Sequence, residues 1–154
     1  MEIERKFLVD RLPDGLEWAD VRRIDQGYLA LDERSGAEVR LRRHGDELSL
    51  TVKGEGGLSR VEVGLPLDED EFKSLWSFTE GRRVEKTRNV VPSGDLRIEV
   101  DVYDGALAGL VIAEVEFGSE EDSAAFEPPA WFGAEVTDDP RYKNRALAVD
   151  GRPA

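Results

Sequence analysis

Charged side chains of both signs recur at every second position in short segments of the chain. The first segment carries Glu2, Glu4 and Lys6, and a late one carries Glu114 and Glu116. Arginine and lysine bind phosphate oxygens, whereas carboxylates hold hard divalent cations such as Mg²⁺. A face that carries both kinds of group is therefore suited to a polyphosphate with its metal ion.

The alternation is typical of β-strands, in which residues two apart point to the same side of a sheet. Gly, Pro, Asp and Ser separate the segments, as hairpin loops require. We therefore expect consecutive antiparallel strands, over residues 2–9, 22–31, 38–44, 47–53, 58–65, 82–91, 96–103 and 110–117.

Helices are expected at three places. Phe72 and Trp76 recur at helical spacing within 68–79, and Asp68 with Glu71 is suited to an N-terminal cap. A second helix is expected to begin at Ser119. A third is expected over 140–149, with proline in the first turn, where its missing N–H costs little.

Each strand divides into two faces, and in several strands one face is wholly apolar, as with Leu48, Leu50 and Val52. The other face carries charge in nearly every strand. Its members are Glu2, Glu4, Lys6, Arg40, Arg42, Lys53, Arg60, Glu62, Lys86, Arg88, Arg97, Glu99, Asp101, Glu114 and Glu116.

An antiparallel sheet can keep such a charged face in water. A meander of eight strands, however, tends to curl and close, which would place one complete face inside. A buried charged face must be wet, internally paired and filled by a ligand that needs both signs. The predicted fold is therefore mainly β, a closed eight-stranded antiparallel barrel or tunnel with a charged lumen and a few flanking helices.

The composition of the chain limits the kinds of metal site and partner that it can have. The 154 residues have a net charge of −13, no cysteine and one histidine, His44, which we expect in an exposed turn. Any metal site must then be built from carboxylates, and the acidic balance argues against a nucleic-acid partner. Without a secretory leader or an apolar run of membrane length, we expect a single domain over 1–154, located in the cytoplasm, with no membrane partner.

Other residues favour structural roles. Arg5, Arg23 and Arg43 fall on the opposite side of their strands from the charged set, so we expect them to form salt bridges on the outer face. Trp76 and the Trp131 region are expected to pack rather than to bind.

The EIERK segment, with Glu2, Glu4 and Lys6, resembles the ExExK signature of the CYTH, or triphosphate tunnel metalloenzyme, superfamily. Later segments continue the resemblance in order along essentially the whole chain: VRLR, TVKG, SRVEV, EKTR, EVDVY and EVEF. The chain is most similar to the small single-domain bacterial members that hydrolyse inorganic triphosphate. A closed eight-stranded tunnel is the fold that this resemblance implies.

The resemblance also implies residue roles. Glu2, Glu4, Glu114 and Glu116 would bind Mg²⁺ or Mn²⁺, and Glu62, Glu99 and Asp101 are weaker candidates for a second metal or its waters. The triphosphate-binding residues would be Lys6, Arg40, Arg42, Lys53, Arg60, Lys86 and Arg88. Tyr28 and Lys86 match a pair proposed to activate the attacking water. Tyr28 as a plain sheet aromatic and Lys86 as a plain phosphate ligand remain open.

Hydrolysis of tripolyphosphate to pyrophosphate and phosphate is therefore the expected activity. Thiamine triphosphatase, a broader nucleoside triphosphatase and class IV adenylate cyclase are alternatives that share the tunnel. A non-catalytic polyphosphate-binding module and a structural sandwich belong to other classes. The sequence has no evident base-recognition element, and it is compatible with a homodimer.

Overall fold

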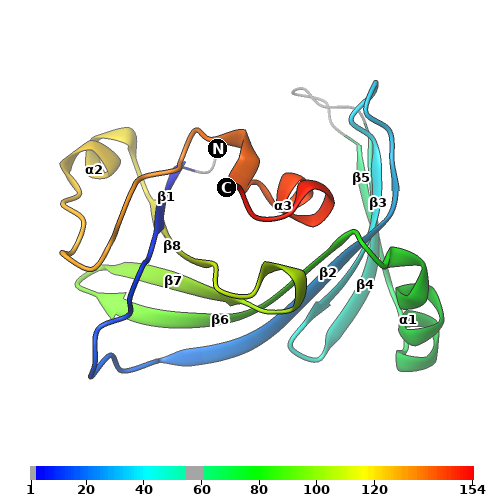
Figure 1. Cartoon of the computed structure of the whole chain (residues 1–154), viewed down its shortest axis with the longest axis horizontal. Helices are drawn as coiled ribbons and strands as arrows, with labels where there is room; N and C mark the ends of the chain where they lie inside the picture. Colours follow the sequence, from blue (N-terminus) through cyan, green and yellow to red (C-terminus); the bar gives the residue numbers. More distant parts are fainter. Residues whose placement is uncertain (1–2, 55–60) are drawn as a thin grey trace.

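The computed structural model describes residues 3–54 and 61–154, and its main element is one antiparallel sheet of eight strands. The strand order is β1-β8-β7-β6-β2-β3-β4-β5. The strands are β1 (Ile3–Leu8), β2 (Asp20–Leu31), β3 (Glu38–His44), β4 (Glu47–Lys53), β5 (Glu62–Pro66), β6 (Arg83–Ser93), β7 (Leu96–Tyr103) and β8 (Val111–Phe117). Figure 1 shows that the sheet curves into an open C.

The eight antiparallel strands confirm the predicted class, but closure into a barrel is not seen. In the described residues β1 and β5 are the two edges of the sheet and do not pair with each other. The predicted ranges of β3, β4 and β7 coincide with the structure, and most other ends differ by one or two residues. Residues 58–60 of the predicted fifth strand lie outside the described residues.

Three helices flank the sheet: α1 (Glu69–Trp76), α2 (Glu120–Ala125) and α3 (Asn144–Asp150). The predicted cap of α1 is confirmed, because the Glu71 amide donates to the Asp68 carboxylate at 2.8 Å and the Asp68 amide donates to Glu71 at 2.9 Å. In the described part of the chain, no helix has the length and apolar character needed to cross a membrane.

The prediction of a single helix over 140–149 was wrong. A 3₁₀ turn, η3 (Pro140–Tyr142), is followed by Lys143 in an extended conformation, with φ −72° and ψ 146°, and only then by α3. The extended residue interrupts the helical backbone, so the two pieces are separate elements.

The apolar side of the sheet faces outward, as predicted, and is covered in two places. Phe72 of α1 packs with Leu41 and Leu48, while Phe132 and its neighbours cover the strands around Val100. The charged side therefore lies inside the C.

Helix α3 sits within the curve of the sheet (Figure 1). Its Leu147 and Ala148 pack against Tyr28, Tyr103 and Ile112. One end of the inner face is therefore apolar and filled by protein.

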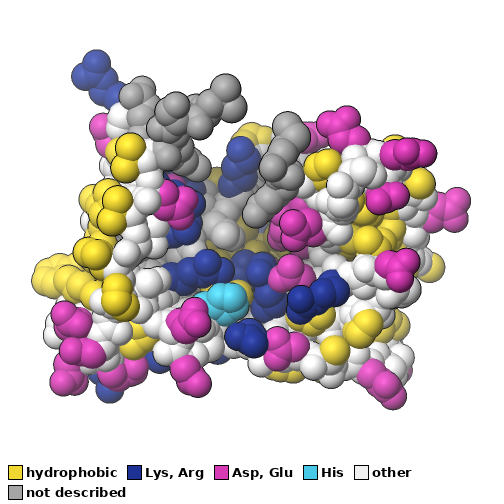
Figure 2. Space-filling model, turned by 180° about the vertical axis from the view of Figure 1, so that it is seen from behind, with side chains coloured by type: hydrophobic (Ala, Val, Ile, Leu, Met, Phe, Trp, Pro, Cys, Tyr) yellow, Lys and Arg dark blue, Asp and Glu magenta, His cyan; other side chains and the backbone are white. Residues whose placement is uncertain are grey.

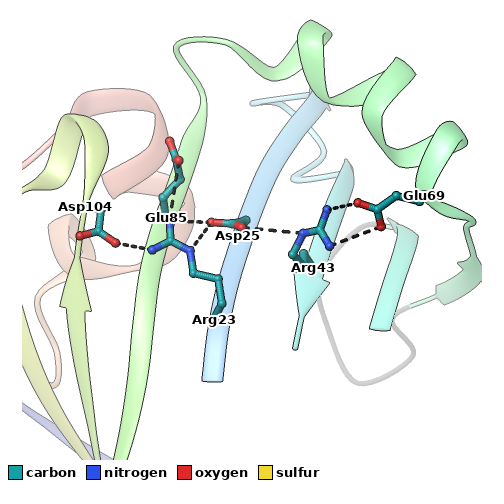
Figure 3. Close-up of polar contacts among 6 residues, drawn as sticks. All are labelled: Arg23, Asp25, Arg43, Glu69, Glu85 and Asp104. Carbon is teal, nitrogen blue, oxygen red and sulfur yellow. Dashed lines mark hydrogen bonds and ion pairs between the residues drawn. The ribbon is translucent and has the colours of Figure 1, made fainter. Parts of the chain in front are cut away.

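The outer face carries a chain of ion pairs across the middle of the sheet (Figure 3). Arg23 contacts Asp25, Glu85 and Asp104, and Arg43 contacts Asp25 and the Glu69 carboxylate of α1. Arg5 similarly pairs with Glu135 at 2.8 Å. The expected outer-face roles of these three arginines are confirmed, although exposed pairs of this kind stabilise by only about 0–1 kcal/mol each.

Candidate active site

A polar cavity of about 430 Å³ lies on the inner face of the sheet. Its walls come from β1, β3, β6, β7 and β8, with one residue from η3 and one from the start of α3. The lining residues are Glu4, Lys6, Arg40, Arg42, Lys86, Arg88, Glu99, Tyr103, Ile112, Glu114, Glu116, Tyr142 and Asn144. The alternation along the strands brings most of the predicted residues to this one place.

The carboxylates form one wall because of strand register. Glu4 lies opposite Glu116 in the β1–β8 pair, and Glu114 lies opposite Glu99 in the β7–β8 pair. Residues directly opposite each other on one face have their Cβ atoms about 5 Å apart, and like charges so placed repel. Burial, followed by the nearby Glu114 and Asp101, raises the pKa of Glu99 despite the opposing effect of Arg88. This wall therefore favours a bound cation.

Arg40 and Arg42 of β3 form the facing basic wall. Their Nε atoms are buried and have no hydrogen-bond partner among the described residues. Burial, then the neighbouring Arg40 and Arg88, lowers the pKa of Arg42. Buried donors without acceptors are costly, so an anion with several oxygens would satisfy them.

Lys86, Arg88 and Asp101 form a buried charge cluster between the two walls. Lys86 Nζ lies 2.9 Å from Asp101 Oδ2, with the two side chains 5% and 2% exposed. Arg88 donates through Nε and Nη2 to both oxygens of Asp101, at 2.9 and 3.0 Å, and its Nη1 pairs with Glu99 at 2.8 Å. The carboxylate of Asp101 thus fixes the positions of two cations that line the cavity.

The cluster shifts the titration of its members. Burial lowers the pKa of Lys86, and Arg88 lowers it further, while Asp101 opposes both. Burial alone would raise the pKa of Asp101, but Lys86 and Arg88 outweigh it and hold that pKa below its usual range. Lys86 is therefore a buried amine whose proton is held less tightly than that of an exposed lysine.

Tyr28 is not among the residues that line the cavity. The side chain is 2% exposed, stands opposite Arg40 in the β2–β3 pair, and its hydroxyl oxygen accepts a hydrogen bond from Gln26 Nε2 at 2.9 Å. Burial raises the pKa of this phenol, with a further contribution from Glu38. Its hydroxyl faces the charged part of the inner face, whereas its ring joins the apolar cluster around α3.

Comparison with known proteins agrees with this arrangement. The family model for the CYTH domain matches residues 1–142. The chain belongs to the CYTH family. The resemblance first seen in the EIERK segment is thereby confirmed.

Two curated relatives with high coverage are both named inorganic triphosphatase. An inorganic triphosphatase from Nitrosomonas europaea is 53% identical over 150 residues, which cover 96% of this chain and 97% of the relative. An inorganic triphosphatase from Acetivibrio thermocellus is 37% identical over 153 residues, covering 95% and 92%. A crystal structure of the inorganic triphosphatase NE1496 matches with a TM-score of 0.85 and 47% identity, covering 97% of this chain and 95% of that one.

Several residues expected in the CYTH site either are not part of the cavity lining or fall outside the described residues. Glu2 and Arg60 are outside the described residues. Lys53 and Glu62 face each other across β4 and β5, at the far edge of the sheet, and do not line the cavity. Asp101 points to its two cations instead of lining the cavity.

Other residues of the cavity were missed. Tyr103 continues the alternation of Glu99 and Asp101, so extending that pattern by one step would have found it. Tyr142 ends η3 and Asn144 begins α3, on either side of the extended Lys143, where no periodicity points to a site. Glu38 continues the alternation of Arg40 in the other direction; it is not part of the lining, but it is 9% exposed and its Oε2 has no partner among the described residues.

The donor set fits a hard divalent cation, because the acidic wall offers only carboxylate oxygens. Within residues 3–54 and 61–154, no three acidic side chains converge closely enough to hold a metal by themselves. Mg²⁺ commonly takes one or two carboxylates and completes its shell with water and substrate phosphates. The wall matches that mode of binding better than an all-protein cage.

Proposed function

We propose that this CYTH protein hydrolyses inorganic triphosphate to pyrophosphate and orthophosphate in a metal-dependent reaction. The observation that carries the proposal is the pairing of an acidic wall with a basic wall across one polar cavity of about 430 Å³. The names of the relatives agree with it.

The acidic wall and the basic wall have different roles in this proposal. Glu4, Glu114, Glu116 and Glu99 would hold Mg²⁺ or Mn²⁺, together with Glu2 of the ExExK signature. A bound divalent ion supplies charge neutralisation at the transferring phosphoryl group and a lower pKa for the attacking water. Lys6, Arg40, Arg42 and Arg88 bind the phosphate oxygens and orient the chain of three phosphoryl groups.

Lys86 has the environment expected of a group that takes part in proton transfer. It is buried, its pKa is lowered, and it lines the cavity. We propose that Lys86 accepts a proton from the attacking water or orients that water with Tyr28, while Asp101 keeps the amine in place.

The sheet is proposed to close further around the substrate. Lys6 and Glu4 lie on the β1 arm of the C, and Arg40 and Arg42 lie on the β3 arm. A triphosphate that contacts both arms would draw them together, giving the tunnel that the sequence predicts. Lys53 and Glu62 would approach the substrate on closure.

A substrate panel tests the proposed function. Phosphate release would be measured from tripolyphosphate, ATP and thiamine triphosphate, each with Mg²⁺, Mn²⁺ or chelator. We expect kcat/KM for tripolyphosphate to exceed the other two by at least about tenfold, because the cavity lining consists mainly of charged groups suited to phosphate and metal. A preference for ATP or thiamine triphosphate would replace the proposal with one of the rival activities.

A further inference from the structure

A second polar hollow opens at the end of the sheet away from α3. It has a volume of about 290 Å³, and we call it the His44 pocket; its polar lining residues are Asp20, Arg22, His44, Arg88, Arg97 and Glu99. Figure 2 shows the one histidine of the chain, in cyan, at the edge of a hollow where basic side chains gather.

Three arginines and two carboxylates line the His44 pocket. Arg22 pairs with Asp20 at 2.8 Å and Arg88 pairs with Glu99 at 2.8 Å, so the charge in excess belongs to Arg97. Arg22 and Arg88 stand directly opposite each other in the β2–β6 pair, where like charges repel. The Arg97 side chain is exposed and makes no hydrogen bond or ion pair within residues 3–54 and 61–154, although its charge acts on Asp20 and Glu99. Burial, followed by Arg42, Arg88 and Arg22, lowers the pKa of His44, which agrees with a positive potential at this point.

One ion pair separates the His44 pocket from the main cavity. Arg88 and Glu99 line both spaces, and Arg88 Nη1 lies 2.8 Å from Glu99 Oε2. A continuous phosphate chain would have to break this contact to occupy both, so a separate small anion is the better occupant. The opposite end of the inner face is filled by Leu147 and Ala148.

We propose that the His44 pocket binds orthophosphate, the smaller product, on its way out of the main cavity. This inference rests on the proposed function. Arg97 and Arg22 would contact the dianion from β7 and β2, and Arg88 would approach it from the side of the cavity. Guanidinium groups suit this role because they donate in a fork to two phosphate oxygens.

Product inhibition tests the proposal. Pyrophosphate formation from tripolyphosphate would be followed by ion chromatography at increasing orthophosphate, in the wild type and in Arg97→Ala. We expect non-competitive inhibition of the wild type and an inhibition constant at least about tenfold higher in Arg97→Ala, because a charge-assisted contact is lost. Arg34→Ala is the matched control, since Arg34 lies in the turn at the other end of the β2–β3 hairpin.

Two results would overturn the proposal that the His44 pocket binds orthophosphate. One is an absence of orthophosphate inhibition, and the other is purely competitive inhibition with an equal constant in Arg97→Ala, which would place orthophosphate in the main cavity. Calorimetric titration of the same proteins with orthophosphate separates this inference from the proposed function. If the wild type fails to cleave tripolyphosphate, weaker phosphate binding by Arg97→Ala would still support the pocket, and equal binding would reject it.

Discussion

Lys86 Nζ and Asp101 Oδ2 lie 2.9 Å apart in the buried centre of the inner face. The same carboxylate accepts two hydrogen bonds from Arg88. Asp101 therefore compensates two cations of the cavity at once. Its role in this arrangement is to position Lys86 and Arg88, and the role of metal ligand is better suited to the carboxylates of β1 and β8 that line the cavity.

Removing the Asp101 charge should destabilise the protein strongly. Asp101→Asn leaves Lys86 and Arg88 buried without their shared counter-charge, and breaking such a pair costs about 3–5 kcal/mol. Urea denaturation would measure the change in the free energy of unfolding. Asp104→Asn is the control, because its pair with Arg23 is half exposed and should be worth at most about 1 kcal/mol. Equal effects of the two substitutions would contradict the central role of Asp101.

The acidic wall can be tested through Glu114 and Glu116. Each change to Gln keeps the shape of the side chain but removes a hard anionic ligand, so metal-dependent kcat/KM should fall by at least about 100-fold. The fold should persist, because both residues lie on the polar inner face, and circular dichroism would show this. Glu121→Gln, on exposed α2, serves as the control. Retention of more than about a tenth of wild-type activity would exclude a direct metal role.

Strand alternation predicted the sheet, its two faces and most of the cavity from sequence. Alternation says which side of a strand a residue takes, but not how far the sheet closes around that side. Glu62 has the same alternation as the other acidic residues, yet it lies on the far edge strand because the sheet remains open.

The register between neighbouring strands was also not predicted from the sequence. Asp101 and Glu99 share one strand and one face, but the register sets Asp101 opposite Arg88 and Glu99 opposite Glu114. Register depends on loop geometry that the sequence did not specify. The position of α3 inside the curve was also not predicted, because the sequence pattern does not show which residues Leu147 packs against.

The proposed pair of Tyr28 and Lys86 makes a kinetic prediction. If Lys86 helps to activate water, Lys86→Ala should lower kcat by about 10² to 10⁴-fold, whereas a plain phosphate ligand would mainly raise KM. Tyr28→Phe should also lower kcat, and the double variant should be little worse than the poorer single variant, because the two act as a unit. Full additivity, or a Tyr28→Phe enzyme of wild-type rate, would remove Tyr28 from the mechanism.

The close packing around Gly27 leads to a prediction about stability. A Cβ atom at this position would lie 2.6 Å from Cβ and Oγ1 of Thr79, which is fully buried. Gly27→Ala should therefore destabilise the fold by about 1–3 kcal/mol through overpacking. Gly118→Ala is the matched control, since the nearest atom there would be 4.0 Å away. Thermal denaturation of both variants would measure the difference, and an unchanged melting temperature for Gly27→Ala would show that Thr79 can move aside.

Phosphorus NMR of the purified protein with tripolyphosphate is the most direct test of the central claim. After incubation with Mg²⁺ or Mn²⁺ and removal of the metal by chelator before the spectrum is recorded, we expect one pyrophosphate and one orthophosphate from each tripolyphosphate, and no reaction when the chelator is present from the start. Pyrophosphate should accumulate without further cleavage, because it lacks the third phosphoryl group that spans the two walls. Absence of conversion with either metal, or conversion that survives the chelator, would contradict a metal-dependent triphosphatase in this cavity.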